Sequence, residues 1–128
     1  MIVLNNDYAI CSRIMFIPKG AFMNIFDIPQ DVLMQELSET ICQGENIRIE
    51  RIISTGQASP DGFWYNQNDD EWVLLLQGEA DISFDDGTTT TLKAGEYIFI
   101  PAHKKHRVEK TSINPACIWL CVFGIFKI

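Results

Sequence analysis

The sequence predicts an all-β domain with the architecture of a sandwich or a barrel. From residue 46 onward, short segments alternate apolar and polar side chains, a period typical of half-buried strands. Residues that favour turns, mainly Gly, Pro and Asp, separate these segments at intervals of about 8–12 residues. Residues 116–123 are almost wholly apolar, which indicates a strand covered on both faces.

One earlier segment has the spacing of a helix. Residues 31–43 place apolar and long side chains three or four positions apart, and Asp31 is a candidate cap. The residues on that face are Val32, Leu33, Glu36, Leu37 and Thr40. We therefore predict a short N-terminal helix here, with a strand over part of the segment as the alternative.

Strands are predicted through the rest of the chain, joined by short turns. They are expected at residues 47–53, 71–77, 80–84, 89–92, 96–100, 106–111 and 116–123. Residues 55–62 form a loop by their Gly, Pro and Asp content. Asp85, Asp86 and Gly87 are typical of a hairpin turn, and this role explains the paired aspartates better than a ligand pair does.

Composition limits the classes of function. The chain has 128 residues, 47% of them hydrophobic, which suits one domain with an ordinary core. Its 17 acidic and 10 basic residues give a net charge of -7, which argues against nucleic-acid and anionic-membrane partners. The four cysteines form no C-x-x-C pair, and we expect free, buried thiols in a reducing compartment.

The N-terminal residues read as an extension of doubtful role. Residues 1–22 lack a basic start, and the apolar run 13–18 is too short to span a bilayer, so we expect no signal peptide. We predict a cytoplasmic protein with a single domain at residues 23–128. Met23 looks like a natural start, and a chain that begins there is expected to fold normally.

Two motifs resemble the cupin superfamily. Glu71 is followed after six residues by Gly78, which matches the second half of that family's first motif. Gly95, Pro101 and His106 have the spacing of the second motif, and one predicted hairpin separates the two motifs. The resemblance covers about residues 45–123. It implies a double-stranded β-helix, also called a jelly-roll barrel, and often a homodimer.

The resemblance also implies a divalent metal inside the barrel. Glu71 stands at the position of the first-motif glutamate and His106 at that of the second-motif histidine, both of which are metal ligands in the family. The first-motif histidines are absent. Their places fall on Tyr65 and Gln67, or on Trp64 and Asn66, depending on the gap before Glu71. His103 and Lys110 replace a glycine and an asparagine of the second motif.

Two chemical hypotheses remain for this site. Residues two apart on a strand share a face, so Gln67 and Glu71 are expected to meet His106, with His103 as a further ligand, around Zn, Mn, Fe or Ni. Without a metal, Glu71 and His106 can serve as base and acid, with Tyr65 as an additional catalytic residue. This hypothesis predicts isomerase- or lyase-type chemistry on a small polar molecule. The alternative is a ligand-binding or sensing protein without catalysis.

Several other side chains are candidates for the substrate pocket or an interface. Trp64, Tyr65 and Lys110 are expected to line the pocket, with Lys110 able to hold an anionic substrate. Residues 104–107 form a short basic cluster, which either attracts anions or is simply solvated. Trp72 lies on the face opposite Glu71 and fits inter-sheet packing or a dimer contact. The apolar segment 116–123 likewise predicts a homodimer.

Overall fold

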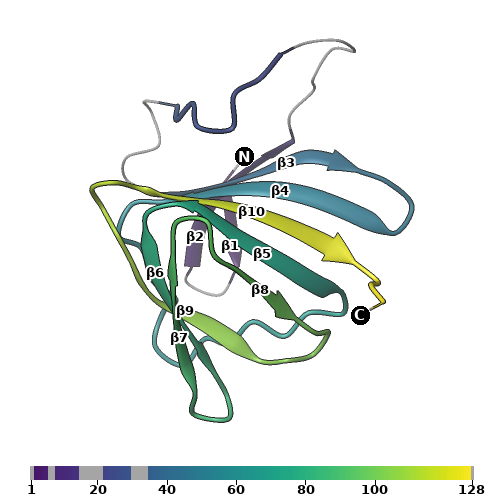
Figure 1. Cartoon of the computed structure of the whole chain (residues 1–128), viewed down its shortest axis with the longest axis vertical. Helices are drawn as coiled ribbons and strands as arrows, with labels where there is room; N and C mark the ends of the chain where they lie inside the picture. The colour runs from purple at the N-terminus through teal and green to yellow at the C-terminus, as the bar shows by residue number, and fades with distance from the viewer. Residues whose placement is uncertain (1, 6–7, 15–21, 30–34, 128) are drawn as a thin grey trace.

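The chain forms two sheets that curve around a shared core (Figure 1). The computed structural model describes residues 2–5, 8–14, 22–29 and 35–127. The strands are β1 (Ile2–Asn5), β2 (Tyr8–Ile14), β3 (Glu36–Gln43), β4 (Ile47–Ser54), β5 (Asp70–Gln77), β6 (Glu79–Phe84), β7 (Thr89–Lys93), β8 (Tyr97–Ile100), β9 (His106–Thr111) and β10 (Cys117–Gly124). The large sheet has the order β1-β2-β3-β4-β10-β5-β8 and the small sheet the order β7-β6-β9. The all-β prediction is confirmed.

The predicted helix is wrong over the part of it that the structure describes. Residues 36–43 form strand β3, whereas residues 31–34 lie outside the described residues. β3 pairs with β4 on one side and with β2 on the other, and these ladders outweigh a weak helical spacing. Successive side chains of β3 lie on opposite faces of the sheet. Leu37 and Glu39 point away from the core between the two sheets, and Glu36 points toward it.

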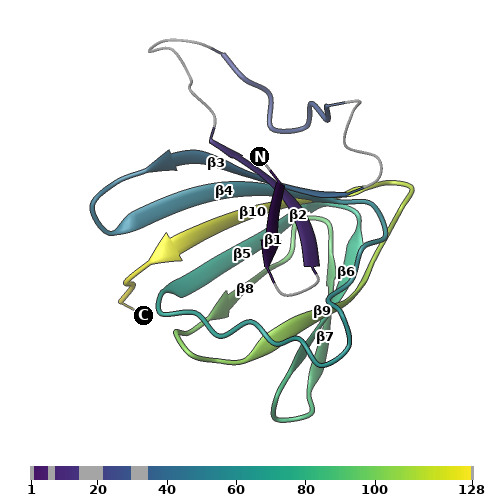
Figure 2. The same cartoon turned by 180° about the vertical axis from the view of Figure 1, so that it is seen from behind.

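The N-terminal residues extend the large sheet. β1 and β2 form an antiparallel pair, and β2 runs parallel to β3 from Ile10 to Ile14. Both strands are nearest the viewer in Figure 2. The strand pairing at this edge adds hydrogen bonds to β3 but does not show that folding requires them. Normal folding of a chain without residues 1–22 therefore stays a prediction.

A buried ion pair fastens residues 22–29 to the outer face of the large sheet. The Arg51 guanidinium lies 3.0 Å from both carboxylate oxygens of Glu39, and the two side chains are 6% and 0% exposed. The other terminal nitrogen of Arg51 donates to the carbonyls of Ile25 and Asp27, at 3.0 and 2.6 Å. Beside this pair, Ile28 packs on the buried residues of β3 and β4.

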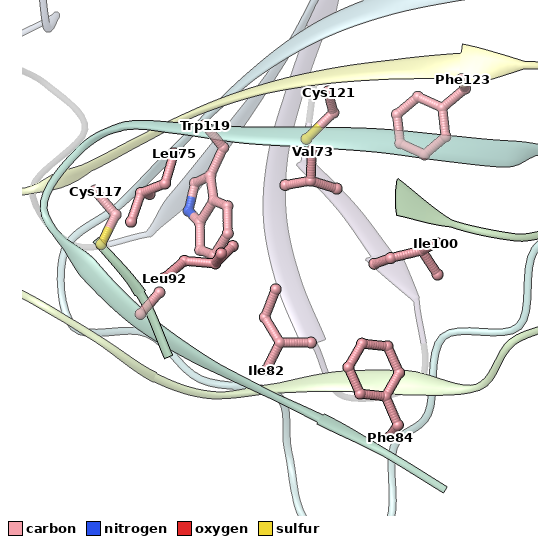
Figure 3. Packing of buried hydrophobic residues seen from close by; sticks show 11 residues of the cluster. Val73, Leu75, Ile82, Phe84, Leu92, Ile100, Cys117, Trp119, Cys121 and Phe123 are labelled. Carbon is pink, nitrogen blue, oxygen red and sulfur yellow. The ribbon is translucent and has the colours of Figure 1, made fainter. Parts of the chain in front are cut away.

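The core lies between the two sheets, as Figure 3 shows. Its side chains come from both sheets and include Val73, Leu75, Ile82, Phe84, Leu92, Ile100, Cys117, Trp119, Cys121 and Phe123. Burial alternates along β5, so Glu71, Val73 and Leu75 face this core and Trp72 faces outward. Trp119 is a core residue, and its indole nitrogen donates to the Ser54 hydroxyl at 3.1 Å.

Gly78 lets the chain pass from the large sheet to the small one. It lies between β5 and β6 with a φ of +90°, a conformation that favours glycine. A Cβ at this position would come within 2.8 Å of the Cys117 sulfur and 2.7 Å of the Ser112 hydroxyl. The glycine six residues after Glu71 is therefore required by the turn and by the close approach of β10.

Candidate functional site

Glu71 is a buried carboxylate on the inner face of β5. Its Cα pairs with Ile100 of β8 and with Phe123 of β10, so the side chain emerges between two neighbouring strands. The residue is 6% exposed. Its Oε2 atom is buried and has no hydrogen-bond partner. An ionised carboxylate oxygen without a donor in a protein interior is unfavourable, which marks this atom as one that needs a proton, a cation or a ligand.

His106 begins β9 and faces this carboxylate from the small sheet. Its Nδ1 lies 2.9 Å from the Lys104 carbonyl oxygen, which can only accept, so Nδ1 carries a hydrogen. In the neutral imidazole, Nε2 is then an acceptor. Nε2 lies 3.6 Å from Glu71 Oε2, and both side chains are 8% exposed. Two acceptors therefore face one another unless one of them takes up a proton.

The segment before β5 runs beside His106. The backbone N–H of Tyr65 donates to the His106 carbonyl at 2.7 Å, and the His106 N–H donates back at 3.2 Å. The Tyr65 ring stacks on the imidazole, with centroids 5.3 Å apart and an angle of 23°. Two residues further on, the Oε1 atom of Gln67 is buried without a hydrogen-bond partner. Tyr65 thus supports the imidazole, and Gln67 supplies a second unpartnered acceptor.

The three other predicted site residues are placed elsewhere. His103 is exposed, has a φ of +63°, and bonds the Asn66 side chain at 3.0 Å, so it does not meet Glu71. Trp64 is 37% exposed and stacks against the Arg107 guanidinium at 5.8 Å. Lys110 is exposed because a register shift in the β6–β9 ladder places it opposite Asp81. A bulge of this kind turns a side chain to the other face.

Three side chains on the same inner face were missed by the sequence analysis. Arg48 and Glu50 of β4 form an ion pair, with Nε 2.8 Å from Oε1, and the guanidinium also lies 4.3 Å from the centre of the Phe123 ring. Cys121 of β10 lies opposite Glu50 in the strand register. Alternating charges in residues 47–53 are typical of a strand face in contact with solvent. In this protein, however, the Arg48–Glu50 pair lies on the inner face of β4.

Burial changes the proton affinity of two of these groups. Burial raises the pKa of the Glu50 carboxyl, an effect that Arg48 opposes and the nearby Glu71 charge reinforces. Burial also raises the pKa of the Cys121 thiol well above its ordinary value, and the charges of Glu71, Glu50 and Glu36 add to that rise. The thiol therefore stays protonated at neutral pH and donates to Glu71. Cys117 and Cys121 are both free and buried, as predicted, whereas Cys42 is free but exposed, contrary to the prediction.

Asp70 fixes the loop that precedes His106. Its carboxylate accepts from the Ala102 N–H at 2.8 Å and from the Phe126 N–H at 3.1 Å. These two bonds hold the pKa of Asp70 below its ordinary value of 3.8. The carboxylate thus connects the start of β5 to the loop after β8 and to the C-terminal residues.

The sequence pattern of the cupin domain family matches residues 52–123. The chain belongs to the cupin family. A comparison with curated proteins finds no match. Among the residues that the structure describes, no helical segment has the length and apolar character that a membrane span needs.

Similar solved structures agree with this assignment. A protein from Ralstonia eutropha JMP134, described as a candidate mannose-6-phosphate isomerase, is 35% identical and has a TM-score of 0.77; the match covers 84% of this cupin and 100% of that chain. A cupin superfamily protein from Desulfitobacterium hafniense DCB-2 is 26% identical over 73% of this chain and 80% of its own, with a TM-score of 0.62. A protein of unknown function from Streptococcus pyogenes is 24% identical over 88% and 93%, with a TM-score of 0.65, and shows the shared fold alone.

The donor atoms in this cupin do not fit the metal that such barrels often hold. Among the described residues, no three His, Cys, Asp or Glu side chains gather as a possible metal site. Glu71 and His106 are two strong ligands, and the Gln67 amide is a weak third. Catalytic zinc sites take three protein ligands of the His, Cys or carboxylate type. No chemical step below is therefore assigned to a metal.

Proposed function

We propose that this cupin is an acid–base enzyme that acts on a small polar molecule inside the barrel, with Glu71 and His106 as the catalytic pair. The observation that supports this role is the 3.6 Å separation of two buried side chains whose facing atoms have no donor between them. A single proton held by the pair leaves one group able to accept a proton and the other able to donate one.

The fixed tautomer assigns a direction to the chemistry. With the single proton of the pair on His106 Nε2, Glu71 Oε2 accepts a proton from a carbon atom next to a carbonyl group, and the His106 imidazolium donates its Nε2 proton to the carbonyl oxygen. The other imidazole nitrogen keeps its hydrogen on the Lys104 carbonyl throughout. Isomerisation follows when Glu71 returns its proton to the former carbonyl carbon and the neutral His106 Nε2 takes the proton of the hydroxyl on the other carbon, whereas loss of a leaving group gives elimination. The Ralstonia relative, described as a candidate isomerase, supports the first of these reaction types.

Proton exchange tests this proposal on several candidate substrates at once. The protein is incubated in D2O with dihydroxyacetone, D-mannose, pyruvate and the phosphate esters of the two sugars, and loss of C–H signals is followed by NMR. We expect exchange with at least one compound, reduced about 100-fold or more in Glu71→Gln and in His106→Ala. The exposed Glu109→Gln variant is the control and should keep the wild-type rate. Absence of exchange with every compound contradicts the catalytic role.

Two further outcomes bear on the alternatives. Binding of a compound without exchange would assign a non-catalytic binding or sensing role to the same residues. Metal analysis of the purified protein tests the remaining alternative. A stoichiometric transition metal that is lost in both Glu71→Gln and His106→Ala would replace the metal-free proposal with a metal-assisted one.

We also propose that the protein is a homodimer that associates through the outer face of the large sheet. Trp72, Tyr97, Phe99, Val122 and Phe126 line an apolar hollow of about 440 Å³ on that face, together with Lys127. Tyr97 is 67% exposed, although it lies beside Trp72 with ring centres 5.6 Å apart. An exposed aromatic group of this kind is typical of interface centres.

A further inference from the structure

We infer that the ligand of the Glu71–His106 pair is a small, uncharged, hydroxyl-rich molecule and not a phosphorylated or carboxylated one. This inference rests on the proposed function, and it concerns which molecules the site can hold. The hydrogen-bonding character of the inward-facing atoms, the positions of the basic side chains and the sign of the charge around the site all support it.

The buried side-chain atoms of Glu71 and Gln67 that lack a hydrogen-bond partner are both acceptors. Glu71 is 6% exposed, and its Oε2 has no donor; the same holds for the buried Oε1 of Gln67. His106 Nε2 adds a third acceptor whenever the imidazole is neutral, because Nδ1 holds the hydrogen. A ligand satisfies such a set by bringing donors. Hydroxyl groups do so without a net charge, and neighbouring hydroxyl groups can share the two oxygens of one carboxylate.

The basic side chains of residues 35–127 are either paired or exposed. Arg48 is the one that faces inward beside Glu50, with which it forms an ion pair of 2.8 Å. Arg51 is buried on the opposite face of the sheet against Glu39. Lys104 lies 3.0 Å from Asp86, near the hairpin turn. Arg107 donates to the loop carbonyls of residues 59 and 60. The remaining basic residues of this range are exposed lysines, namely Lys93, Lys105, Lys110 and Lys127.

The charge around the site also disfavours an anion. Glu71 and Glu50 both lie on the inner face, on the two strands that flank β10. A phosphate or carboxylate next to Glu71 would bring a further negative charge into a partly desolvated region in which Arg48 already faces Glu50 and a protonated His106 already faces Glu71. A neutral ligand avoids this repulsion and still donates to the acceptors.

A small hollow lies next to Phe123, the residue of β10 that pairs with Glu71. The hollow measures about 190 Å³ and is lined by Arg48, Asp69, Phe123 and the turn between β3 and β4, but not by Glu71 or His106. Phe123 is the residue paired with Glu71, and Asp69 lies two residues before it on the same face. This volume is below the roughly 300–1,000 Å³ of pockets that hold drug-sized ligands. A molecule that reaches the pair through this hollow would therefore be smaller than a drug-sized ligand.

Matched pairs of compounds test the inference. D-mannose is compared with D-mannose 6-phosphate, and dihydroxyacetone with its phosphate, by isothermal titration calorimetry on the full-length protein; ethanolamine is included as a cationic probe. We expect at least one neutral compound to bind, and its phosphate ester to bind at least tenfold more weakly. Gln67→Leu should weaken binding of the neutral compound at least tenfold, whereas Glu109→Gln should not change it. Circular dichroism and the melting temperature establish that both variants are folded.

The outcomes separate this inference from the proposed function. Tighter binding of a phosphate ester or of ethanolamine overturns the inference, and so does failure of both neutral compounds to bind. If exchange in D2O is then still seen with an anionic compound, the acid–base role stands while the ligand assignment falls. If a neutral compound binds but is not exchanged, the ligand assignment stands and the catalytic role falls.

Discussion

Removal of one partner from the Arg51–Glu39 ion pair is expected to destabilise the protein strongly. Glu39→Gln keeps the size of the side chain but removes its charge, and it leaves the Arg51 guanidinium buried with one amide oxygen and two backbone carbonyls as acceptors. Loss of one partner from a buried ion pair costs about 3–5 kcal/mol. The remaining amide oxygen places our expectation near the lower value, about 3 kcal/mol, which is a large part of the roughly 5–15 kcal/mol that stabilise an ordinary domain.

Denaturant unfolding followed by Trp fluorescence measures this change in the free energy of unfolding. Two further variants serve as comparisons. Asp69→Asn removes the charge of a partly exposed carboxylate 4.0 Å from Arg48 and should cost less than about 1 kcal/mol. Glu39→Leu combined with Arg51→Met removes both buried charges and should cost less than Glu39→Gln alone, although two carbonyls lose a donor. Equal effects of Glu39→Gln and Asp69→Asn, or a double variant less stable than the single one, would refute this reasoning.

Three other predictions concern the loop, the interface and the N-terminus. Because two amides lower the pKa of Asp70 in the folded protein, its contribution to stability is present above its ordinary value of 3.8 and is lost as the pH falls through the lowered folded value. Asp70→Asn should therefore be less stable than the wild type at pH 7, and urea unfolding should show the difference shrink below pH 3.8; a difference that grows there would contradict it. Tyr97→Lys should give a monomer by light scattering at micromolar concentration, whereas a wild-type protein that is itself monomeric would rule out the dimer. A chain that starts at Met23 should keep its circular dichroism spectrum and melting temperature, and insolubility or a large drop in that temperature would show that residues 1–22 are needed.

The sequence predicted the barrel because its strands are regular and its motifs fix two turns. The positions of Glu71 and Gly78 follow from alternation along one strand and from a turn that requires a positive φ. The error at residues 36–43 arose because a weak helical spacing was read without the neighbouring strands. Propensity is a weak signal when two ladders compete with it.

The site could be predicted only as far as strict alternation holds. His106 and Val108 obey it, whereas the register shift beyond them places Lys110 on the exposed face. A single extra residue in one strand is invisible in a pattern of apolar and polar letters. The inward Arg48–Glu50 pair was missed for a related reason, since two opposite charges that satisfy one another can lie on an inner face and still look like a solvated one.

The adjacent acids Asp70 and Glu71 of β5 have different roles. Glu71 presents its free oxygen to the imidazole, while Asp70 holds the loop whose Lys104 carbonyl orients that imidazole. The hydrogen bond that orients His106 is therefore made to a backbone carbonyl and not to the side chain at position 71. In protein engineering, this separation would allow position 71 to be varied through a library of acids, amides and alcohols while the imidazole keeps its alignment, so that reactivity could be redesigned at one codon.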